Sequence, residues 1–303
     1  MAQLGKRVWA EVSGDELLDR AAALAYYFVF ALFPMMLFLM AMMGMLAGPG
    51  SQMRTELMQY LSTVLPESAS GLVQQVVDQT TKASGGGKLS FGILLSLWSA
   101  SAGVVALMNA LNAVYDVKES RSFIKARAIA LGLTIALSVL IISALVLILY
   151  GGKIAELVGN MMNLGGAFTV AWKIAQWPVA LACLVVAFAL VYYFAPNVKQ
   201  PTWHWITPGA VVGVALWLVA SFAFKIYLSF SNTYSATYGS VGAVIILMLW
   251  FYVTGLSLLM GGEINAEIEH AAAEHGDQEA KARGERTPGE VASRHPSEKR
   301  PAA

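Results

Sequence analysis

Six long apolar segments dominate the pattern of hydrophobic and polar positions along this 303-residue chain. A helix that crosses a bilayer needs ~20 mostly apolar residues at a rise of about 1.5 Å each, and every segment reaches about that length. The pattern therefore predicts an all-α integral membrane protein with six transmembrane helices. The predicted spans are about 24–47, 89–115, 127–150, 174–195, 205–229 and 239–262.

The polar segments outside these spans predict the remaining organisation. Ser13 and Glu16 form a capping box, which predicts a cytoplasmic amphipathic helix within residues 1–23 that leads into a six-helix transmembrane domain over 24–268. The tail, 269–303, is charged, contains proline and has few large apolar side chains. Such a segment buries too little apolar surface to offset its ordering entropy, so we expect it to be disordered.

The one sizeable loop on the outer side is the predicted periplasmic loop 48–88. Apolar residues recur there at helical spacing on both sides of Pro66, as at Met53, Leu57 and Leu61 and again at Leu72 and Val76. The spacing predicts short amphipathic helices in this first extracytoplasmic loop. They lie either in the membrane interface or as a cap packed over the bundle, and the pattern favours neither.

The composition agrees with a polytopic membrane protein. Hydrophobic residues make up 57% of the chain and charged residues 13%, about half of the ~25% of a soluble domain, and the mean hydropathy is +0.60. The single cysteine, Cys183, excludes an intrachain disulfide and a cysteine-rich metal site. No cofactor is predicted.

The basic residues predict the orientation. Alternating assignment of the flanks puts fourteen of the twenty Lys and Arg residues on one side, and four of them lie in the short loop 116–127. Because cytoplasmic loops carry the excess of positive charge, both termini are predicted to be cytoplasmic, N-in and C-in. The fourteen are Lys6, Arg7, Arg20, Lys118, Arg121, Lys125, Arg127, Lys199, Lys281, Arg283, Arg286, Arg294, Lys299 and Arg300.

Depth along the spans separates the polar side chains. Counting residues at about 1.5 Å each puts Arg20, Asp116 and Glu263 near the cytoplasmic boundary and Lys225 at the opposite interface. The count leaves no ionisable side chain at the bilayer midplane. Ion-coupled carriers usually keep one there, so the pattern counts against coupled transport.

Two groups of residues form the candidate site. Asn109, Asn112 and Asp116 recur at spacings of three and four, on one stripe that descends to the cytoplasmic boundary. They predict a polar cytoplasmic mouth together with Arg20, Arg121, Glu263 and Asn265. The alternative is a set of inter-helix clamps and charge pairs that only hold the bundle together.

Aromatic residues suggest a path beyond this mouth. Pro34 interrupts the backbone hydrogen bonds of the first span and lies near Tyr26 and Tyr27, while Tyr192 and Tyr193 lie in the fourth span. These five residues are the candidate path. The alternative, which is the more common case for such a proline, is that it only shapes the helix and that the tyrosines hydrogen-bond between helices.

Catalytic patterns are missing. The four histidines form no H-E-x-x-H or H-x-H pattern, and no G-x-S-x-G occurs, so neither a metal site nor an enzyme is predicted. Basic residues in the tail alternate with acidic ones and lack aromatic partners, so nucleic acid is not an expected partner.

The sequence resembles the YihY/BrkB family of bacterial inner-membrane proteins. The resemblance is carried by AAALAYYFVFALFPMMLFL (21–39), 99–131, LVYYFAPNVK (190–199), 203–252 with YGSVGAVIILMLWFY (238–252), and GGEINAEIE (261–269). It implies a multi-pass inner-membrane protein of unsettled biochemical activity, from a family with links to serum resistance in pathogens and, in related branches, to envelope lipid homeostasis. Some members carry a ribonuclease label, which nothing in this sequence supports. The resemblance marks, without roles, Arg20, Asn109, Asn112, Tyr115, Asp116, Glu119, Arg121, Glu263 and Asn265.

The leading hypothesis is a protein that moves or positions a lipid or other amphiphile without ion coupling, with membrane lipids as partners. The alternative is an anchor that recruits an unknown envelope protein, and a membrane-embedded enzyme ranks last. Small-xxx-small pairs such as Gly209/Gly213 permit close helix packing within the bundle or in a homo-oligomer.

Overall fold

A computed structural model describes residues 16–47, 86–162, 165–198, 207–230, 234–276 and 280–287. The capping box at Ser13 and the predicted helices of the loop 48–88 lie outside these ranges. Every regular element within them is a helix, and six helices hold a segment long and apolar enough to cross a membrane, so the all-α prediction is confirmed for this part of the chain. They are α2 (Leu17–Ala47), α5 (Gly86–Val114), α6 (Phe123–Met161), α7 (Gly165–Phe194), α8 (Pro208–Phe230) and α9 (Tyr234–Glu274).

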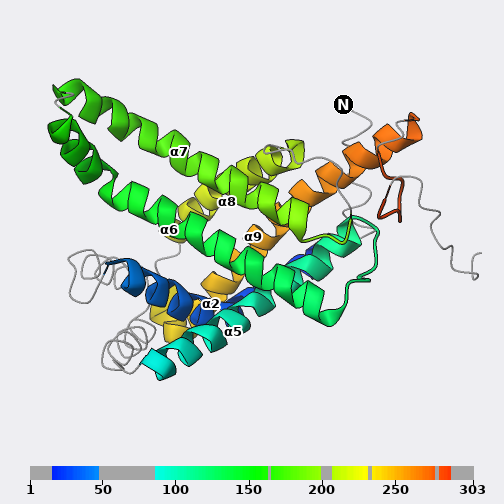
Figure 1. Ribbon diagram of the computed structural model, residues 1–303. Helices are drawn as coiled ribbons and strands as arrows, with labels where there is room; N and C mark the ends of the chain where they lie inside the picture. The colour runs from blue at the N-terminus through cyan, green and yellow to red at the C-terminus, as the bar shows by residue number, and fades with distance from the viewer. Residues whose placement is uncertain are drawn as a thin grey trace, which may run out of the picture.

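Six helix ends meet at one end of the bundle, which we call the polar end. There α2, α6 and α8 begin and α5, α7 and α9 end, and Figure 1 shows this end on the right. Cross-helix contacts confirm the grouping, because Arg121 reaches the last carbonyls of α7 and Asn265 of α9 reaches the first turn of α8. The start of α2 and the end of α9 therefore lie on the same side of the bundle.

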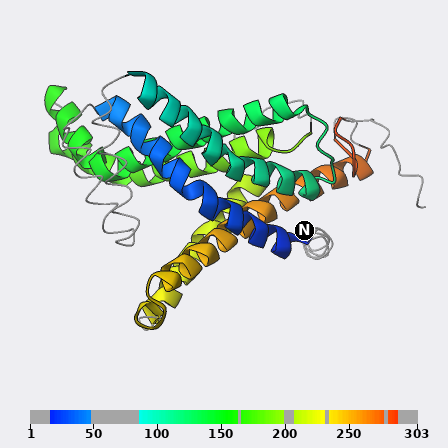
Figure 2. The same ribbon diagram turned by 90° about the horizontal axis from the view of Figure 1, so that it is seen from below.

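The buried core lies toward the polar end. Its residues come from the start of α2, the end of α5, the start of α6, the end of α7 and the facing parts of α8 and α9, with Leu24, Leu111, Tyr192 and Leu259 among the most buried. Away from this core the α6–α7 pair and the α8–α9 pair diverge, and the divergence is plain in both Figure 1 and Figure 2. The bundle is thus closed at one end and splayed at the other.

The hairpin of α6 and α7 is longer than predicted. The sequence pattern predicts a connection over 151–173, but α6 runs to Met161 and α7 begins at Gly165. Two contacts lie across the extended part of the hairpin: Lys173 Nζ lies 3.7 Å from Glu156 Oε1 at an exposed position, and Gly159 packs beside the Phe168 ring, where even a Cβ would be in ordinary van der Waals contact. The two helices therefore stay paired beyond their apolar spans.

The tail also differs from its expected disorder. Helix α9 continues to Glu274, well past the predicted end at 262, and residues 280–287 fold back onto the bundle. We call residues 280–287 the strap. Its basic side chains Lys281 and Arg283 meet acidic side chains of α9, and this charge pairing supplies the stabilisation that a scan for apolar residues misses. Residues 277–279 and 288–303 lie outside the described ranges.

Helices α8 and α9 cross at a contact between glycines. A Cβ on Gly261 would lie 2.5 Å from the carbonyl oxygen of Gly209 and 3.1 Å from the Cα of Gly213, while a Cβ on Gly209 would overlap the Gly261 carbonyl. Beside the crossing, the Tyr192 hydroxyl of α7 donates a 2.9 Å hydrogen bond to the Leu258 carbonyl. Only glycine allows backbones to approach this closely.

Candidate functional site

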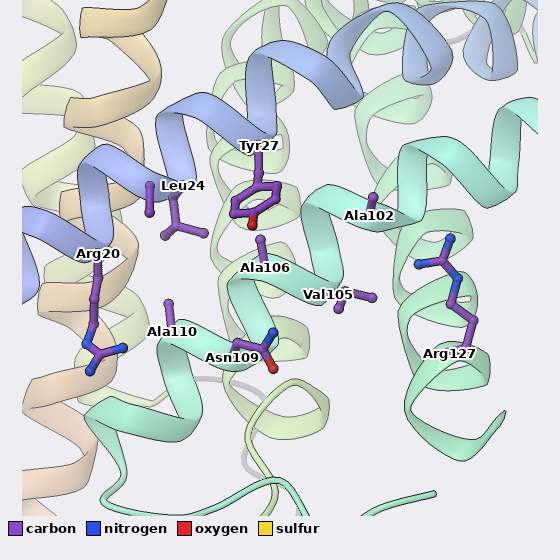
Figure 3. A pocket seen from close by; sticks show the side chains of 10 residues that line it. Arg20, Leu24, Tyr27, Ala102, Val105, Ala106, Asn109, Ala110 and Arg127 are labelled. Atoms are coloured by element: carbon purple, nitrogen blue, oxygen red, sulfur yellow. The ribbon is translucent and has the colours of Figure 1, made fainter. Parts of the chain in front are cut away.

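A pocket opens between α2, α5 and the start of α6. Its volume is about 380 Å³, and Figure 3 shows its wall of side chains. Ala102, Ala106 and Ala110 follow one another at four-residue spacing on α5, so they form one face of that helix over about 12 Å. Small side chains along this face leave the space that larger residues would fill. The other lining residues are Arg20, Ala23, Leu24, Tyr27, Val105, Asn109 and Arg127.

Three of the predicted site residues meet in this pocket. Arg20 is in the first turn of α2, Tyr27 is two turns further along the same helix, and Asn109 projects from α5. Figure 3 shows the Tyr27 hydroxyl directed toward α5, with Arg20 at the end of the pocket nearest Ala110. A cation, an amide and a phenol hydroxyl above an apolar floor form an amphipathic cavity, which suits a ligand with a polar head and an apolar body.

The fourth polar residue of the pocket, Arg127, was not predicted as a site residue. In the sequence it counts only as a charge at the boundary. In the structure its Nη2 donates a 2.5 Å hydrogen bond to the Trp98 carbonyl, and its guanidinium lies 4.0 Å from the centroid of the Trp98 ring. Trp98 precedes the end of α5 at Val114 by sixteen residues, about 24 Å along the helix, so this guanidinium lies deep within the apolar segment Gly92–Val114.

The remaining predicted residues lie in packed contacts at the polar end. Asn112 Nδ2 donates a 3.0 Å hydrogen bond to Glu119 Oε2, and Asn112 Oδ1 accepts a 2.6 Å bond from the backbone N–H of Asn197. Arg121 donates to both oxygens of Glu119 and to the carbonyls of Phe194 and Ala195. Asn112, Glu119, Arg121 and Asn197 thus tie the end of α5 to the end of α7 as an inter-helix clamp, and we call them the polar clamp.

Glu119 carries the negative charge of this clamp. Burial alone would raise its pKa, but hydrogen bonds from the Arg121 side chain and backbone and from Asn112 outweigh burial and lower the pKa from 4.5 to about 2. The folded state therefore favours the ionised carboxylate. The stabilisation is complete above the ordinary pKa and is lost as the pH falls toward the folded value.

We therefore expect acid to weaken the clamp. Between about pH 5 and pH 2 the apparent unfolding temperature of the detergent-solubilised protein should fall, because the unfolded state takes up a proton on Glu119 before the folded state does. Glu119→Gln should lower the free energy of unfolding by about 1–2 kcal/mol at neutral pH. It should also make the fall of the unfolding temperature with pH shallower. An unchanged slope in the variant would show that other carboxylates control the acid response.

Asp116 ends helix α5. It has a positive φ of 54°, and the N–H groups of Asp116 and Val117 donate to the carbonyls of Ala113 and Asn112. This is the Schellman arrangement, in which the residue after the helix adopts a left-handed conformation that aspartate tolerates better than most residues. Its spacing from Asn109 and Asn112 thus reflects a helix end.

Asn265 and Glu263 lie on α9. Asn265 Oδ1 accepts a 2.8 Å hydrogen bond from the Gly209 N–H, and its Nδ2 donates to Thr207 Oγ1 at 3.1 Å, so it caps the start of α8. Glu263 is almost fully buried, on the helix face that also carries Glu267. Neither Asn265 nor Glu263 lines the pocket.

The strap neutralises acidic residues of α9. Arg283 donates to Glu267 and its Nη1 lies 3.9 Å from Asp116 Oδ2, while Lys281 pairs with Glu269. Arg286 adds a 3.3 Å hydrogen bond to the Asn197 carbonyl. The strap therefore contacts α9 and the chain just after both α5 and α7.

The candidate path residues do not form one route. Tyr192 is buried in the core with its hydroxyl bonded to Leu258, and Tyr193 stacks edge-on against Phe194 with ring centroids 4.7 Å apart. Tyr26 packs against Phe30 on an exposed face, and α2 continues as a helix through Pro34. Of these five residues, only Tyr27 lines the pocket.

Comparison with known proteins gives a consistent family signal. The model of the family described as Virulence factor BrkB matches residues 8–285. The chain is 38% identical over 261 residues to "Putative ribonuclease-like protein YfkH" of Bacillus subtilis (strain 168), an alignment that covers 86% of this chain and 93% of that protein. No solved structure matches the chain.

More distant relatives are longer. The chain is 24% identical over 273 residues to "UPF0761 membrane protein xcc-b100_3490" of Xanthomonas campestris pv. campestris (strain B100), covering 88% of this chain and 61% of the relative. A "UPF0761 membrane protein" of Xanthomonas oryzae pv. oryzae (strain PXO99A) is 26% identical over 270 residues, covering 87% and 60%. The chain thus spans about three fifths of the length of these two relatives.

Proposed function

The chain belongs to the virulence factor BrkB family of multi-pass membrane proteins, and from this membership and the pocket geometry we propose that it binds an anionic amphiphile and moves or positions it in the cell envelope. The observation that carries the proposal is the composition of the pocket. Arg20, Asn109 and Tyr27 supply polar contacts along the pocket, and alanines supply an apolar floor beside them. A guanidinium suits a phosphate headgroup and an alanine face suits an acyl chain.

The membrane arrangement follows the same proposal. We place the protein in the bacterial inner membrane with the polar end toward the cytoplasm and both termini on that side. Described basic residues support this, because Arg20, Lys118, Arg121, Lys125 and the strap lie at the polar end, whereas Lys153, Lys173 and Lys225 lie on segments that lead away from it. The bilayer itself would cover the many exposed apolar side chains, such as Val219 and Phe222 of α8.

The proposal assigns neither ion coupling nor catalysis. Glu267 and Glu269 of α9 pair with the strap, and neither lines the pocket. The name of the Bacillus relative includes the word ribonuclease, but this sequence lacks the clustered histidines and acidic residues that a metal-dependent nuclease needs. An envelope protein partner is the competing proposal. Deleting the tail would also remove the strap, which packs on the bundle, so the deletion would change the stability of the bundle as well as any contact with a partner.

Binding of a labelled lipid tests the proposal directly. In neutral detergent, we expect fluorescent phosphatidylglycerol to bind more tightly than fluorescent phosphatidylcholine, measured by anisotropy. Arg20→Gln should weaken phosphatidylglycerol binding about tenfold, which is the loss of one charge-assisted hydrogen bond. The matched control is Lys118→Gln, which removes the same charge at the polar end from an exposed side chain outside the pocket.

Two results would contradict this assignment. One is equal binding of both lipids by the wild type, which removes the preference for an anionic headgroup. The other is equal loss in the Arg20 and Lys118 variants, which would mean that net charge, and not the pocket, attracts the lipid.

A further inference from the structure

The position of Arg127 differs from that of every other described cation at the polar end. It lies in the second turn of α6, yet its side chain reaches Trp98, which is closer to the far end of the apolar segment of α5 than to Val114. A charged side chain at such depth is costly in a bilayer, so it is retained where it has partners and usually where it has a role. Trp98 supplies the partners through its carbonyl and its ring.

The hydrogen bonding of Arg127 is incomplete. A guanidinium carries five N–H donors, and one of them reaches the Trp98 carbonyl. Its Nε is buried and has no hydrogen-bond partner among the described residues. A buried donor without an acceptor is destabilising, so the described protein groups leave the hydrogen bonding of this guanidinium incomplete.

The pocket joins Arg127 to Arg20. Figure 3 shows the two side chains at opposite ends of the pocket, Arg20 beside Ala110 and Arg127 beside Ala102. Between them runs the alanine face of α5, about 12 Å long, so no large side chain from this face separates the two guanidinium groups. One continuous cavity therefore presents a cation near the polar end and a second cation deeper in the apolar segment.

We propose that Arg127 is a second binding position for a phosphate headgroup inside the membrane, to which the headgroup passes from Arg20 along the alanine face. This rests on the proposed function and deepens it, because it names the anionic lipid headgroup as the moving part. Trp98 holds the guanidinium toward the cavity while leaving other donors for the phosphate. A lipid is favoured over free phosphate because the floor between the two arginines is apolar.

The test uses purified full-length protein in liposomes of phosphatidylcholine and phosphatidylglycerol. Transbilayer movement of fluorescent phosphatidylglycerol is measured by dithionite quenching, and binding is measured by anisotropy in detergent. We expect Arg127→Gln to slow movement about tenfold or more while leaving the Arg20-dependent binding largely intact. Arg127→Lys should recover part of the rate, since it keeps the charge and loses the paired donors.

Two further variants keep the result interpretable. Lys125→Gln removes a positive charge from an exposed side chain that lies two residues before Arg127. This variant should move lipid like the wild type. Ala106→Phe narrows the cavity between the arginines without changing either, and it should slow movement even if Arg127→Gln proves unstable. Competition by soluble glycerol 3-phosphate is expected to be weak, and strong competition would make a free phosphate compound the ligand and overturn the lipid assignment.

The outcomes separate the two proposals. If phosphatidylglycerol binds no better than phosphatidylcholine, the proposed function fails. If it binds and moves, but Arg127→Gln and Ala106→Phe both behave like Lys125→Gln, the second position is wrong and the proposed function stands. Binding without any movement by the wild type also overturns the second position and leaves a protein that positions its lipid.

Discussion

Replacement of Gly261 by valine should strongly destabilise the protein. The new Cβ would lie 2.5 Å from the Gly209 carbonyl oxygen and would overlap the Tyr192 hydroxyl, so helices α8 and α9 would have to separate. Backbone atoms cannot move aside as a flexible side chain can. We expect a loss of about 3 kcal/mol or more, seen as a lower apparent Tm and poor recovery of monodisperse protein in detergent.

The matched control is the same substitution at Gly132 of α6. A Cβ there meets nothing within 4 Å, so Gly132→Val changes helix propensity and little else. It should alter stability by about 0.5 kcal/mol or less. Equal destabilisation by both variants would mean that valine in a membrane helix, and not the crossing, sets the cost.

The second large effect is expected at Asn112, whose replacement by aspartate changes chemistry at almost constant volume. The change keeps the acceptor for the Asn197 N–H and replaces the Nδ2 donor, 3.0 Å from Glu119, by a second negative oxygen. A buried carboxylate would then face Glu119, with Arg121 shared between the two. We expect a loss of about 2–4 kcal/mol near neutral pH, measured by thermal unfolding.

Acid should rescue this variant in part. Protonation of either carboxylate relieves the repulsion, so the difference from wild type should shrink between about pH 7 and pH 5. Asn109→Asp, one turn earlier on α5 at an exposed position, serves as control and should stay within about 0.5 kcal/mol of wild type. A deficit that grows on acidification would contradict the role given to the Asn112–Glu119 hydrogen bond.

The helices could be predicted because the bilayer imposes their length. A run of ~20 apolar residues is characteristic of a membrane span, and each predicted span overlaps one of the described helices. Their ends were harder to predict, because ends depend on contacts between segments. The α6–α7 hairpin continues past its apolar spans, with Lys173 beside Glu156 across it, and the strap pairs with α9. Neither is visible as local hydrophobicity.

The candidate site was predicted only in part for a related reason. A helical stripe shows which residues share a face, and Asn109 and Asn112 do so. Asn109 nevertheless lines the pocket, whereas Asn112 accepts a hydrogen bond from the backbone of Asn197, just after α7. That choice depends on where the neighbouring helices pack. Arg127 was not predicted as a site residue, because the sequence shows only a basic residue at the boundary of a span and not that its side chain reaches across to α5 at Trp98. An arginine at the very start of an apolar run was the available signal.

The strap has a consequence for how the protein is made. Residues 280–287 are the last described residues to leave the ribosome, yet Arg283 pairs with Asp116, which is synthesised more than 160 residues earlier. These ion pairs can form only after α9 has inserted beside the end of α5, because only then do their partners lie close together. Strap closure is therefore a late assembly step, and protection of residues 280–287 from protease would distinguish fully inserted chains from chains still in assembly.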